Sequence, residues 1–179
     1  PDEQLFAPWP RQGHEIERLL TLTDHLGLPR QGPHLDFPLR QDERDAAAAR
    51  WPGRFVCLHP GAQLASRRWP PERFAAIGDL LASRGHEVLI TGTAGEAPIA
   101  NAVAAAMRAP AQVLAGQTTL WTLGALIERA ALLVCNDTGA SHVAAALGTP
   151  SVVVSSGSEV SRWAPADRRR HRVLWAARD

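Results

Sequence analysis

The sequence predicts an α/β fold in which a parallel sheet is covered by helices on both faces. Two observations predict it. From residue 55 onward, apolar runs of strand length alternate with amphipathic helical stretches, and repeated strand–helix units of this kind form parallel sheets buried on both sides. The chain has 179 residues, of which 45% are hydrophobic, so it can bury the core of one ordinary domain.

The expected elements follow one another in a regular order. The expected strands are 55–59, 86–91, 112–114, 132–135, 151–155 and a last one near 173–175. The expected helices are 71–84, which Gly85 ends, 95–108, 120–130 and 139–147. Helical spacing predicts two apolar faces that point inward, one made of Phe74, Ile77, Leu80 and Leu81 and the other of Leu120, Leu123, Ile127 and Ala130.

Residues 1–50 are expected to form an N-terminal arm or linker whose helices pack on a domain of residues 51–179. Within the arm, 14–26 has helical spacing and ends at Gly27, 35–39 reads as a short edge strand, and the Ala-rich stretch 41–50 reads as a surface helix. Because the first residue is Pro1, we expect the chain to be a fragment of a longer cytosolic protein.

The composition of the chain argues against several classes of partner and cofactor. The formal net charge is +1, which favours neither nucleic acid nor an acidic membrane, and the run Arg168–Arg170 reads as solvated surface. Cys57 and Cys135 lie in apolar runs and are expected to be reduced, buried thiols. The seven histidines show no metal-ligand spacing, so neither a metal nor another cofactor is expected. No apolar run reaches the roughly 18 residues of a membrane span.

The carboxyl ends of the strands are the expected ligand site, because parallel α/β sheets bind ligands there, where the strand order reverses. After 55–59 comes the small-residue turn 59–63, followed by Arg67 and Arg68. Backbone N–H groups of such a turn can approach an anion, and two arginines can pair with a diphosphate. A solvated loop is the alternative interpretation.

Glu96 follows the second expected strand. A carboxylate at this place can accept hydrogen bonds from both hydroxyls of a ribose. The alternative is a first-turn glutamate that complements the helix dipole.

The stretch 136–142 (NDTGASH) follows the strand 132–135 and is the most informative of the three. Gly139 permits close backbone approach, and Thr138 with the first helical N–H groups offers donors to phosphate oxygens. The alternative is an N-cap at Asp137 beside a buried, satisfied His142. No G-x-G-x-x-G, P-loop or G-x-S-x-G pattern occurs, which argues against common dehydrogenases, P-loop NTPases and serine hydrolases.

Taken together, these stretches resemble a known family. HPGAQLASRRWPPERFAAI, LITGTAGE and LAGQTTLWTLGALIERAALLVCNDTGASHVAAALGTPSVVV are similar, in order and spacing, to the C-terminal domain of glycosyltransferase family nine, the ADP-heptose:lipopolysaccharide heptosyltransferases. The resemblance runs from about residue 55 to 165 and is most specific over 136–150.

The resemblance implies a Rossmann-like domain that forms the C-terminal half of a GT-B glycosyltransferase and binds the nucleotide-sugar donor. Such enzymes transfer heptose from ADP-heptose to the lipopolysaccharide inner core with inversion, at the cytoplasmic face of the inner membrane. Their general base and their acceptor site belong to the N-terminal domain, so the lipopolysaccharide precursor would meet this chain only through that domain. We therefore expect this chain to bind donor nucleotide and to turn nothing over alone.

The resemblance also implies roles for single residues. Arg67 stands where the family has a lysine facing the donor diphosphate, which keeps the charge and changes its geometry. Glu96 matches the acidic residue that meets the adenosine ribose. The remaining matches are Thr118 and Thr119, in the segment lining the base, and Asp137, Thr138, Gly139 and His142, in the phosphate-side loop.

Three alternatives remain at this point. A GT-B transferase could use another nucleotide sugar, such as a UDP-sugar, because the sequence does not identify the base. A non-catalytic module that binds nucleotides or other molecules through an interaction surface is the second alternative, and the presence of Arg67, Glu96 and Asp137 together argues against it. A sugar-nucleotide epimerase shares the architecture but should have different acid and base residues.

Overall fold

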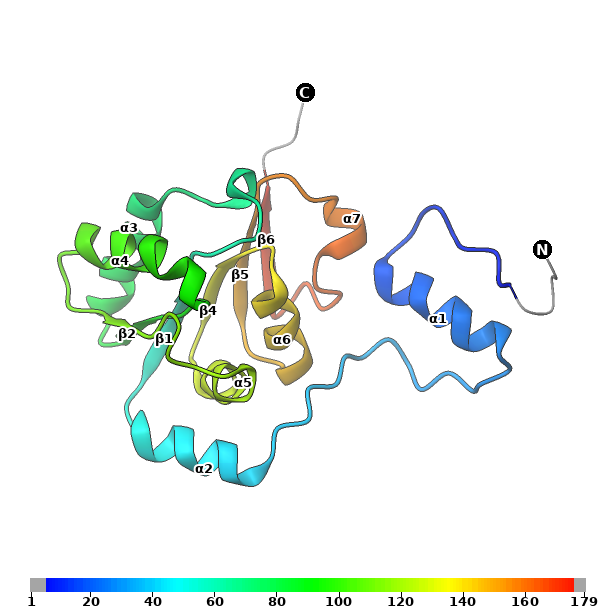
Figure 1. The fold of residues 1–179 in the computed structure, drawn as a ribbon, viewed down its shortest axis with the longest axis horizontal. Helices are drawn as coiled ribbons and strands as arrows, with labels where there is room; N and C mark the ends of the chain where they lie inside the picture. The colour runs from blue at the N-terminus through cyan, green and yellow to red at the C-terminus, as the bar shows by residue number, and fades with distance from the viewer. Residues whose placement is uncertain (1–5, 176–179) are drawn as a thin grey trace.

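Six strands, all paired in parallel, form a single sheet in the order β3-β2-β1-β4-β5-β6 (Figure 1). They appear in a computed structural model that describes residues 6–175. The order reverses between β1 and β4, as it does in Rossmann-like folds. The predicted fold class is therefore confirmed. The strands are β1 (Phe55–His59), β2 (Glu87–Ile90), β3 (Gln112–Val113), β4 (Leu133–Asn136), β5 (Ser151–Ser155) and β6 (His171–Trp175).

Helices cover both faces of the sheet. Alternate residues of β1 point to opposite faces: Val56 and Leu58 pack with α3 and α4, whereas Phe55 and Cys57 pack with α5 and α6. Both faces of a parallel sheet are thus buried, as the near-continuous apolar strands require. The helices are α1 (Glu15–His25), α2 (Gln41–Arg50), α3 (Pro71–Ala82), α4 (Ala97–Ala106), α5 (Leu120–Arg129), α6 (Gly139–Leu147) and α7 (Val160–Trp163).

The expected elements are present with small shifts at their ends. Gly27 and Gly85 end helices with φ of 71° and 84°, a region that glycine enters without steric cost. The strand expected near 173–175 is longer and begins at His171. The helix expected near Glu96 begins one residue later, after a 3₁₀ turn over Ala94–Glu96.

The edge strand expected at 35–39 is wrong. This segment pairs with no strand. It lies over α5 instead, where Leu39 is buried beside Ala125 and Leu126 and the Phe37 ring lies 5.4 Å from that of Trp121. The apolar alternation thus serves packing on a helix, because α5 separates the segment from the sheet.

Two of the residues expected to face inward are exposed. Leu80 has 46% of its surface exposed and Leu120 has 57%. The buried stripe of α3 runs through Phe74, Ala75, Gly78 and Leu81, so Leu80 falls outside it. Leu120 is the first residue of its helix and lines a cleft at the sheet edge.

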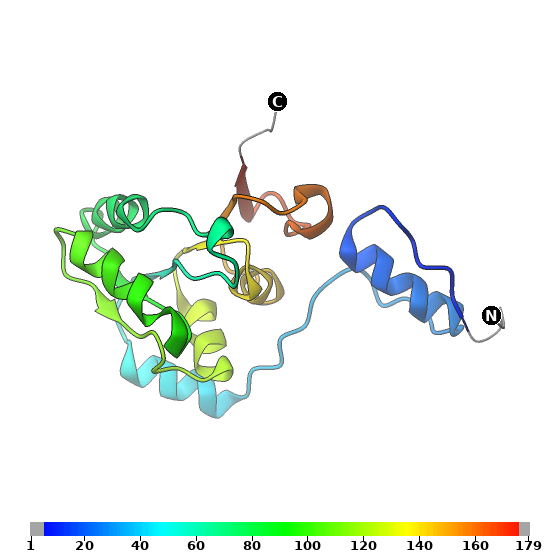
Figure 2. The same cartoon turned by 45° about the horizontal axis from the view of Figure 1, so that its top comes forward.

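The arm meets the domain at two places. Helix α2 packs on α5, with Ala47 in the core and an ion pair between Arg44 and Glu128 at 2.9 Å. Figure 2 shows α2 beside α5 and α1 set apart from the sheet. The division of the chain at residue 50 stays a prediction, and its outer ends, 1–5 and 176–179, lie outside the described residues.

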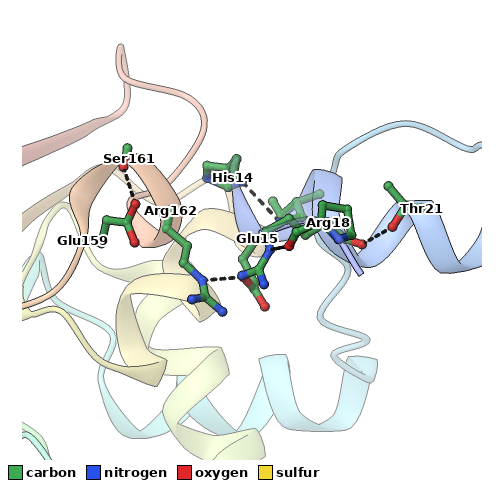
Figure 3. A network of polar contacts seen from close by, with 9 residues as sticks. His14, Glu15, Arg18, Thr21, Glu159, Ser161 and Arg162 are labelled. Atoms are coloured by element: carbon green, nitrogen blue, oxygen red, sulfur yellow. Dashed lines mark hydrogen bonds and ion pairs between the residues drawn. The ribbon is translucent and has the colours of Figure 1, made fainter. Parts of the chain in front are cut away.

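Helix α1 is joined to α7 by polar contacts (Figure 3). His14 Nε2 lies 2.8 Å from the Ala164 carbonyl oxygen, and the Arg162 guanidinium donates to the Glu15 carboxylate at 2.6 Å. Glu15 also accepts from Arg18 at 2.5 Å, and its hydrogen bond with Arg162 helps to hold the pKa of the Glu15 carboxyl below its ordinary value. These contacts fix the beginning of α1 against the segment that follows β5.

Asn136, the last residue of β4, joins three segments at the reversal point of the sheet. Its side chain is fully buried. The side-chain Nδ2 of Asn136 donates to the Pro60 carbonyl at 2.8 Å and to the Gly61 carbonyl at 3.3 Å. The side-chain Oδ1 accepts from the backbone N–H of Trp69 at 3.0 Å. One side chain thus holds both ends of the loop after β1 against the end of β4.

We predict that Asn136→Ala lowers the free energy of unfolding by about 2–4 kcal/mol, because buried backbone groups would lose their partners at about 1–3 kcal/mol each. Urea unfolding monitored by circular dichroism measures it. Asn101→Ala, at an exposed position of α4, is the matched control and should leave stability unchanged. A loss no larger than that of the control would contradict this role.

His171, the first residue of β6, is buried, and its Nδ1 lies 2.8 Å from Oγ of Ser151 on β5. Burial lowers the pKa of the imidazole below its ordinary value of 6.5, against the opposing charge of Asp167, while Arg170 lowers it further. The folded state therefore keeps this side chain neutral at pH values where the unfolded chain would take up a proton.

Stability should accordingly be full above pH 6.5 and decline as the pH falls below it toward the folded pKa. We predict that His171→Asn reduces the slope of the unfolding free energy between pH 7 and pH 5, by no more than the limit of about 1.4 kcal/mol per pH unit for one proton. Denaturant titrations across this range measure it, and His25→Asn, on the exposed side of α1, should keep the wild-type slope. Equal slopes in the wild type and both variants would show that His171 does not cause the loss of stability at low pH.

Candidate nucleotide-binding cleft

A cleft of about 530 Å³ lies at the carboxyl ends of β1, β2 and β4. This is the edge where the strand order reverses, so the place expected for a ligand from the sequence is hollow in the structure. Six of the eight predicted site residues line the cleft, and they are Arg67, Glu96, Asp137, Thr138, Gly139 and His142.

The beginning of α6 forms one wall of the cleft and is uncapped. Thr138 is the N-cap residue, whereas the alternative interpretation of the sequence placed the cap at Asp137, and no side chain caps the first turn. The backbone between Asp137 and the helix is extended, with φ −147° and ψ 178° at Thr138, which places Asp137 before the cap. Thr138 Oγ1 is buried and has no hydrogen-bond partner among residues 6–175. A helix N-terminus with free N–H groups and an unused hydroxyl is suited to bind an anion.

Gly139 is the first residue of α6, and its Cα faces open space. A Cβ built on it would meet no atom within 4 Å, and its φ is not positive. Neither backbone strain nor internal packing therefore requires glycine here. The space that a side chain would occupy is available to a ligand that approaches the helix N-terminus.

Arg67 and Arg68 differ in their surroundings. Arg67 ends the 3₁₀ turn Ala65–Arg67, is half-buried and lines the cleft. Its guanidinium makes no hydrogen bond or ion pair with any other residue that the structure describes. Arg68 is exposed and donates to the Ala62 carbonyl at 2.9 Å. Of the two cations, Arg67 is thus the one available to a ligand in the cleft.

Glu96 is fixed by the turn before α4. Its Oε2 accepts from the Thr93 N–H at 2.8 Å and from the Thr93 hydroxyl at 2.9 Å. Partial burial raises the pKa of the Glu96 carboxyl, but the Thr93 hydrogen bonds and the nearby positive charge of Arg68 act against it, and the pKa is lowered overall. The carboxylate therefore stays ionised. This local role leaves room for the predicted one, which stays a prediction, since Glu96 still lines the cleft.

Gly61 provides the space for that carboxylate. A Cβ on Gly61 would overlap the Glu96 side chain. The small-residue turn after β1 was expected to serve an anion; the structure shows that its glycine makes room for the acidic side chain of the neighbouring strand end.

His59, at the end of β1, lines the cleft and was not among the predicted site residues. Its Nδ1 lies 3.0 Å from Thr91 Oγ1, whose own hydrogen points to the Leu58 carbonyl at 3.3 Å. The neutral imidazole therefore has its proton on Nδ1. Burial lowers the pKa of His59, although Glu96 opposes this. Its position in the sequence could have identified it, since the last residue of a parallel strand lies at the edge of the sheet where ligands bind.

Asp137 and His142 are half-buried residues of the cleft wall. The Asp137 backbone N–H donates to the Val154 carbonyl at 3.1 Å, and neither side chain has a hydrogen-bond partner among residues 6–175. The alternative of a buried, satisfied His142 is therefore wrong. Both side chains keep their polar atoms available to a ligand.

Thr118 and Thr119 do not line the cleft. Thr119 is the N-cap of α5 and accepts from the Thr122 N–H at 3.1 Å, while Thr118 is half-buried beside it. Contact of these two residues with a base stays a prediction.

Other features of the chain give the cleft its context. A cavity of about 660 Å³ lies between α1, α6 and α7 and shares His142 and Trp163 with the cleft. Another, of about 930 Å³, lies at the opposite edge of the sheet, at the amino ends of β2 and β3.

No cluster of metal-ligating side chains occurs within 6–175. Over the same residues, no helix has the length and apolar character needed to span a bilayer. Cys57 and Cys135 are free and fully buried, and burial raises the pKa of the Cys57 thiol to about 12.

The chain is similar to curated lipopolysaccharide heptosyltransferases. It is 32% identical over 114 residues to lipopolysaccharide heptosyltransferase 3 of Escherichia coli, a match that covers 62% of this chain and 34% of that protein. It is 27% identical over 160 residues to the protein of the same name from Escherichia coli strain K12, covering 85% and 46%. Lipopolysaccharide heptosyltransferase 2 of Salmonella typhimurium is 35% identical over 100 residues, covering 53% and 29%. The matches thus span 29% to 46% of the length of these relatives.

Solved structures show the same fold. A family 9 glycosyltransferase from Veillonella parvula superposes with a TM-score of 0.85 at 22% identity, covering 95% of this chain and 51% of that one. The ADP-heptose lipopolysaccharide heptosyltransferase II of E. coli superposes with a TM-score of 0.73 at 26% identity, covering 84% and 48%. Residues 6–178 match the family model described as glycosyltransferase family 9 (heptosyltransferase). The chain belongs to glycosyltransferase family 9.

Proposed function

We propose that this chain is the donor-binding part of an inverting heptosyltransferase that transfers heptose from ADP-heptose to the inner core of lipopolysaccharide. The observation that supports this best is the uncapped N-terminus of α6, which lines one cleft together with Arg67 and Glu96. Donors for phosphate oxygens and an acceptor for sugar hydroxyls thus share one site.

The proposed donor would lie along the carboxyl edge of the sheet. The ribose hydroxyls would donate to Glu96, and the diphosphate would bind the α6 N-terminus, Thr138 Oγ1 and Arg67. Among related structures, one is described as an ADP-heptose enzyme and another, the E. coli heptosyltransferase WaaC at 22% identity, as a complex with ADP. These descriptions support adenine as the base in this chain too.

The cleft can stabilise the leaving group of such a transfer. Breaking the bond between the sugar and the diphosphate places negative charge on the departing phosphate oxygen. The fixed positive end of α6 and the Arg67 guanidinium lie where that charge develops, so they lower the barrier without reorganising. The acceptor hydroxyl needs a general base on the opposite face of the sugar, which we assign to a second domain together with the acceptor site. The chain alone should therefore bind donor without transferring heptose, and the complete enzyme would act at the cytoplasmic face of the inner membrane.

Calorimetric titration with ADP, UDP and GDP tests the proposal. We expect ADP to bind selectively with a dissociation constant of roughly tens to hundreds of micromolar, or about −5 to −6 kcal/mol. Arg67→Ala should weaken binding about tenfold, because it removes a charge-assisted contact with the diphosphate. Arg84→Ala, which removes an exposed arginine at the opposite edge of the sheet, is the matched control and should bind as wild type does.

Other results of these titrations would support other functions. Preference for UDP would keep the fold and change the donor. Binding that Arg67→Ala leaves intact would place the nucleotide elsewhere. Absence of binding for all three nucleotides at millimolar concentration would contradict donor binding by this chain and favour a non-catalytic module.

Gly139 gives a second test, because only the ligand requires the space beside it. We predict that Gly139→Ala leaves the unfolding free energy within about 0.5 kcal/mol of wild type or raises it. The same change should weaken ADP binding at least about tenfold, since a methyl group would stand where the phosphate meets the backbone.

Gly157→Ala is the control for Gly139→Ala. Its Cβ would also meet open space, its φ is not positive, and it does not line the cleft. It should change neither stability nor binding. If Gly139→Ala binds ADP as wild type does, the diphosphate does not contact the beginning of α6.

A further inference from the structure

The strand order gives the bound donor a direction, provided that the proposed function holds. Glu96 follows β2, while Arg67 and the N-terminus of α6 flank the reversal between β1 and β4. A ribose at Glu96 and a diphosphate at α6 therefore define a line that runs from β2 across β1 to β4. The group attached to the far phosphate continues along this line, toward β5 and the segment that follows it.

Trp163, at the end of α7, stands on that side of the cleft. It lines the cleft itself and, together with His142, the adjoining cavity of about 660 Å³. The two hollows therefore meet at these two side chains. The second cavity also has apolar lining residues, among them Leu19, Ala145, Leu147 and Pro165.

The position of Trp163 is fixed from both sides. The preceding residue, Arg162, stacks its guanidinium over the Trp163 ring at 4.7 Å from the centroid and donates to Glu15 at 2.6 Å. The carbonyl of the following residue, Ala164, lies 2.8 Å from His14 Nε2. Figure 3 shows how His14 and Glu15 at the beginning of α1 reach toward α7. The ring is thus held by two successive residues of the arm, although α7 itself has only four residues.

The apolar face of the Trp163 ring and its indole N–H are both available to a ligand. It is half-buried, so part of its ring is accessible from the cleft. Its indole N–H makes no hydrogen bond with any residue in 6–175, in contrast to the indole of Trp51, which donates to Gln112 at 3.1 Å. A pyranose ring presents a face of C–H groups rimmed by hydroxyls, and an aromatic ring with a free polar tip matches both features.

We propose that Trp163 forms the glycosyl subsite of the cleft. Its ring packs against the C–H face of the sugar attached to the nucleoside diphosphate, and its N–H donates to a sugar hydroxyl. Glu15 acts as a positioning residue, since it reaches the sugar only through Arg162 and the Trp163 ring. The inference rests on the proposed function and adds to it the residue that selects the sugar.

The test compares two ligands, ADP and ADP-heptose, by calorimetry on the 179-residue chain. The wild type should bind ADP-heptose about threefold to tenfold more tightly than ADP, the range that one aromatic contact supplies. Trp163→Ala should bring this ratio close to one, and Trp163→Phe, which keeps the ring, should retain most of it. Trp175→Ala removes an exposed tryptophan that lines neither hollow and should keep the wild-type ratio.

Glu15→Gln tests the positioning role. It should lower the affinity ratio about twofold to threefold, a smaller effect than that of Trp163→Ala, because the ring stays present but loses its support. A purely structural role would change the melting temperature and leave the ratio at the wild-type value. That result would limit Glu15 to stabilising the arm and overturn its link to the sugar.

The contradicting outcomes are separable. If the wild type binds ADP but shows no preference for ADP-heptose, or if a folded Trp163→Ala keeps the preference, the glycosyl subsite is wrong and the proposed donor site stands. If the wild type binds neither ligand, the proposed function fails and the subsite with it. Trp163→Leu replaces the alanine variant should the latter not fold, and a wild-type ratio in the leucine variant would equally overturn the subsite.

Discussion

The buried amide of Asn136 is the interaction on which the geometry of the cleft depends. The segments that follow the strands on either side of a reversal point leave toward opposite faces of the sheet, which opens a crevice but leaves the loops around it without a common support. Asn136 provides that support, because it binds Pro60 and Gly61 at the beginning of the β1 loop and Trp69 at its end. Arg67 lies between these anchors, so its place in the cleft follows from a hydrogen bond made by a different strand.

The charges around the cleft are arranged by position along the sheet edge. Positive groups, Arg67 and the α6 N-terminus, lie at the reversal point, and the ionised Glu96 lies one strand away with the neutral His59 beside it. A second cation at His59 would draw the Glu96 carboxylate away from a hydroxyl donor. Burial keeps His59 neutral and so leaves Glu96 as an acceptor, which is the role that a ribose needs.

The fold was predictable because the spacing of apolar residues along the sequence follows the pattern of burial. A strand that is buried on both faces of the sheet is apolar at nearly every position, as in Phe55–His59. Six predicted site residues come together for the same reason, since strand ends meet at one edge. The strand at 35–39 was wrong because packing on α5 produces the same alternation as pairing in a sheet. The N-cap at Asp137 was wrong because one extended residue, Thr138, separates the strand from the helix. Trp163 was missed because its place depends on contacts with Glu15, 148 positions earlier in the chain, and no local pattern encodes them.

Those distant contacts connect the arm to the site. The beginning of α1 holds α7 through residues on both sides of Trp163, and α7 follows β5, the strand next to the one that leads into α6. A displacement of α1 would therefore move the Trp163 ring, whereas the side chains of Arg67 and Glu96 make no hydrogen bond or ion pair with α1 among residues 6–175. The nucleotide half of the cleft is thus set by the sheet, whereas the half that lies toward α7 is set by the arm.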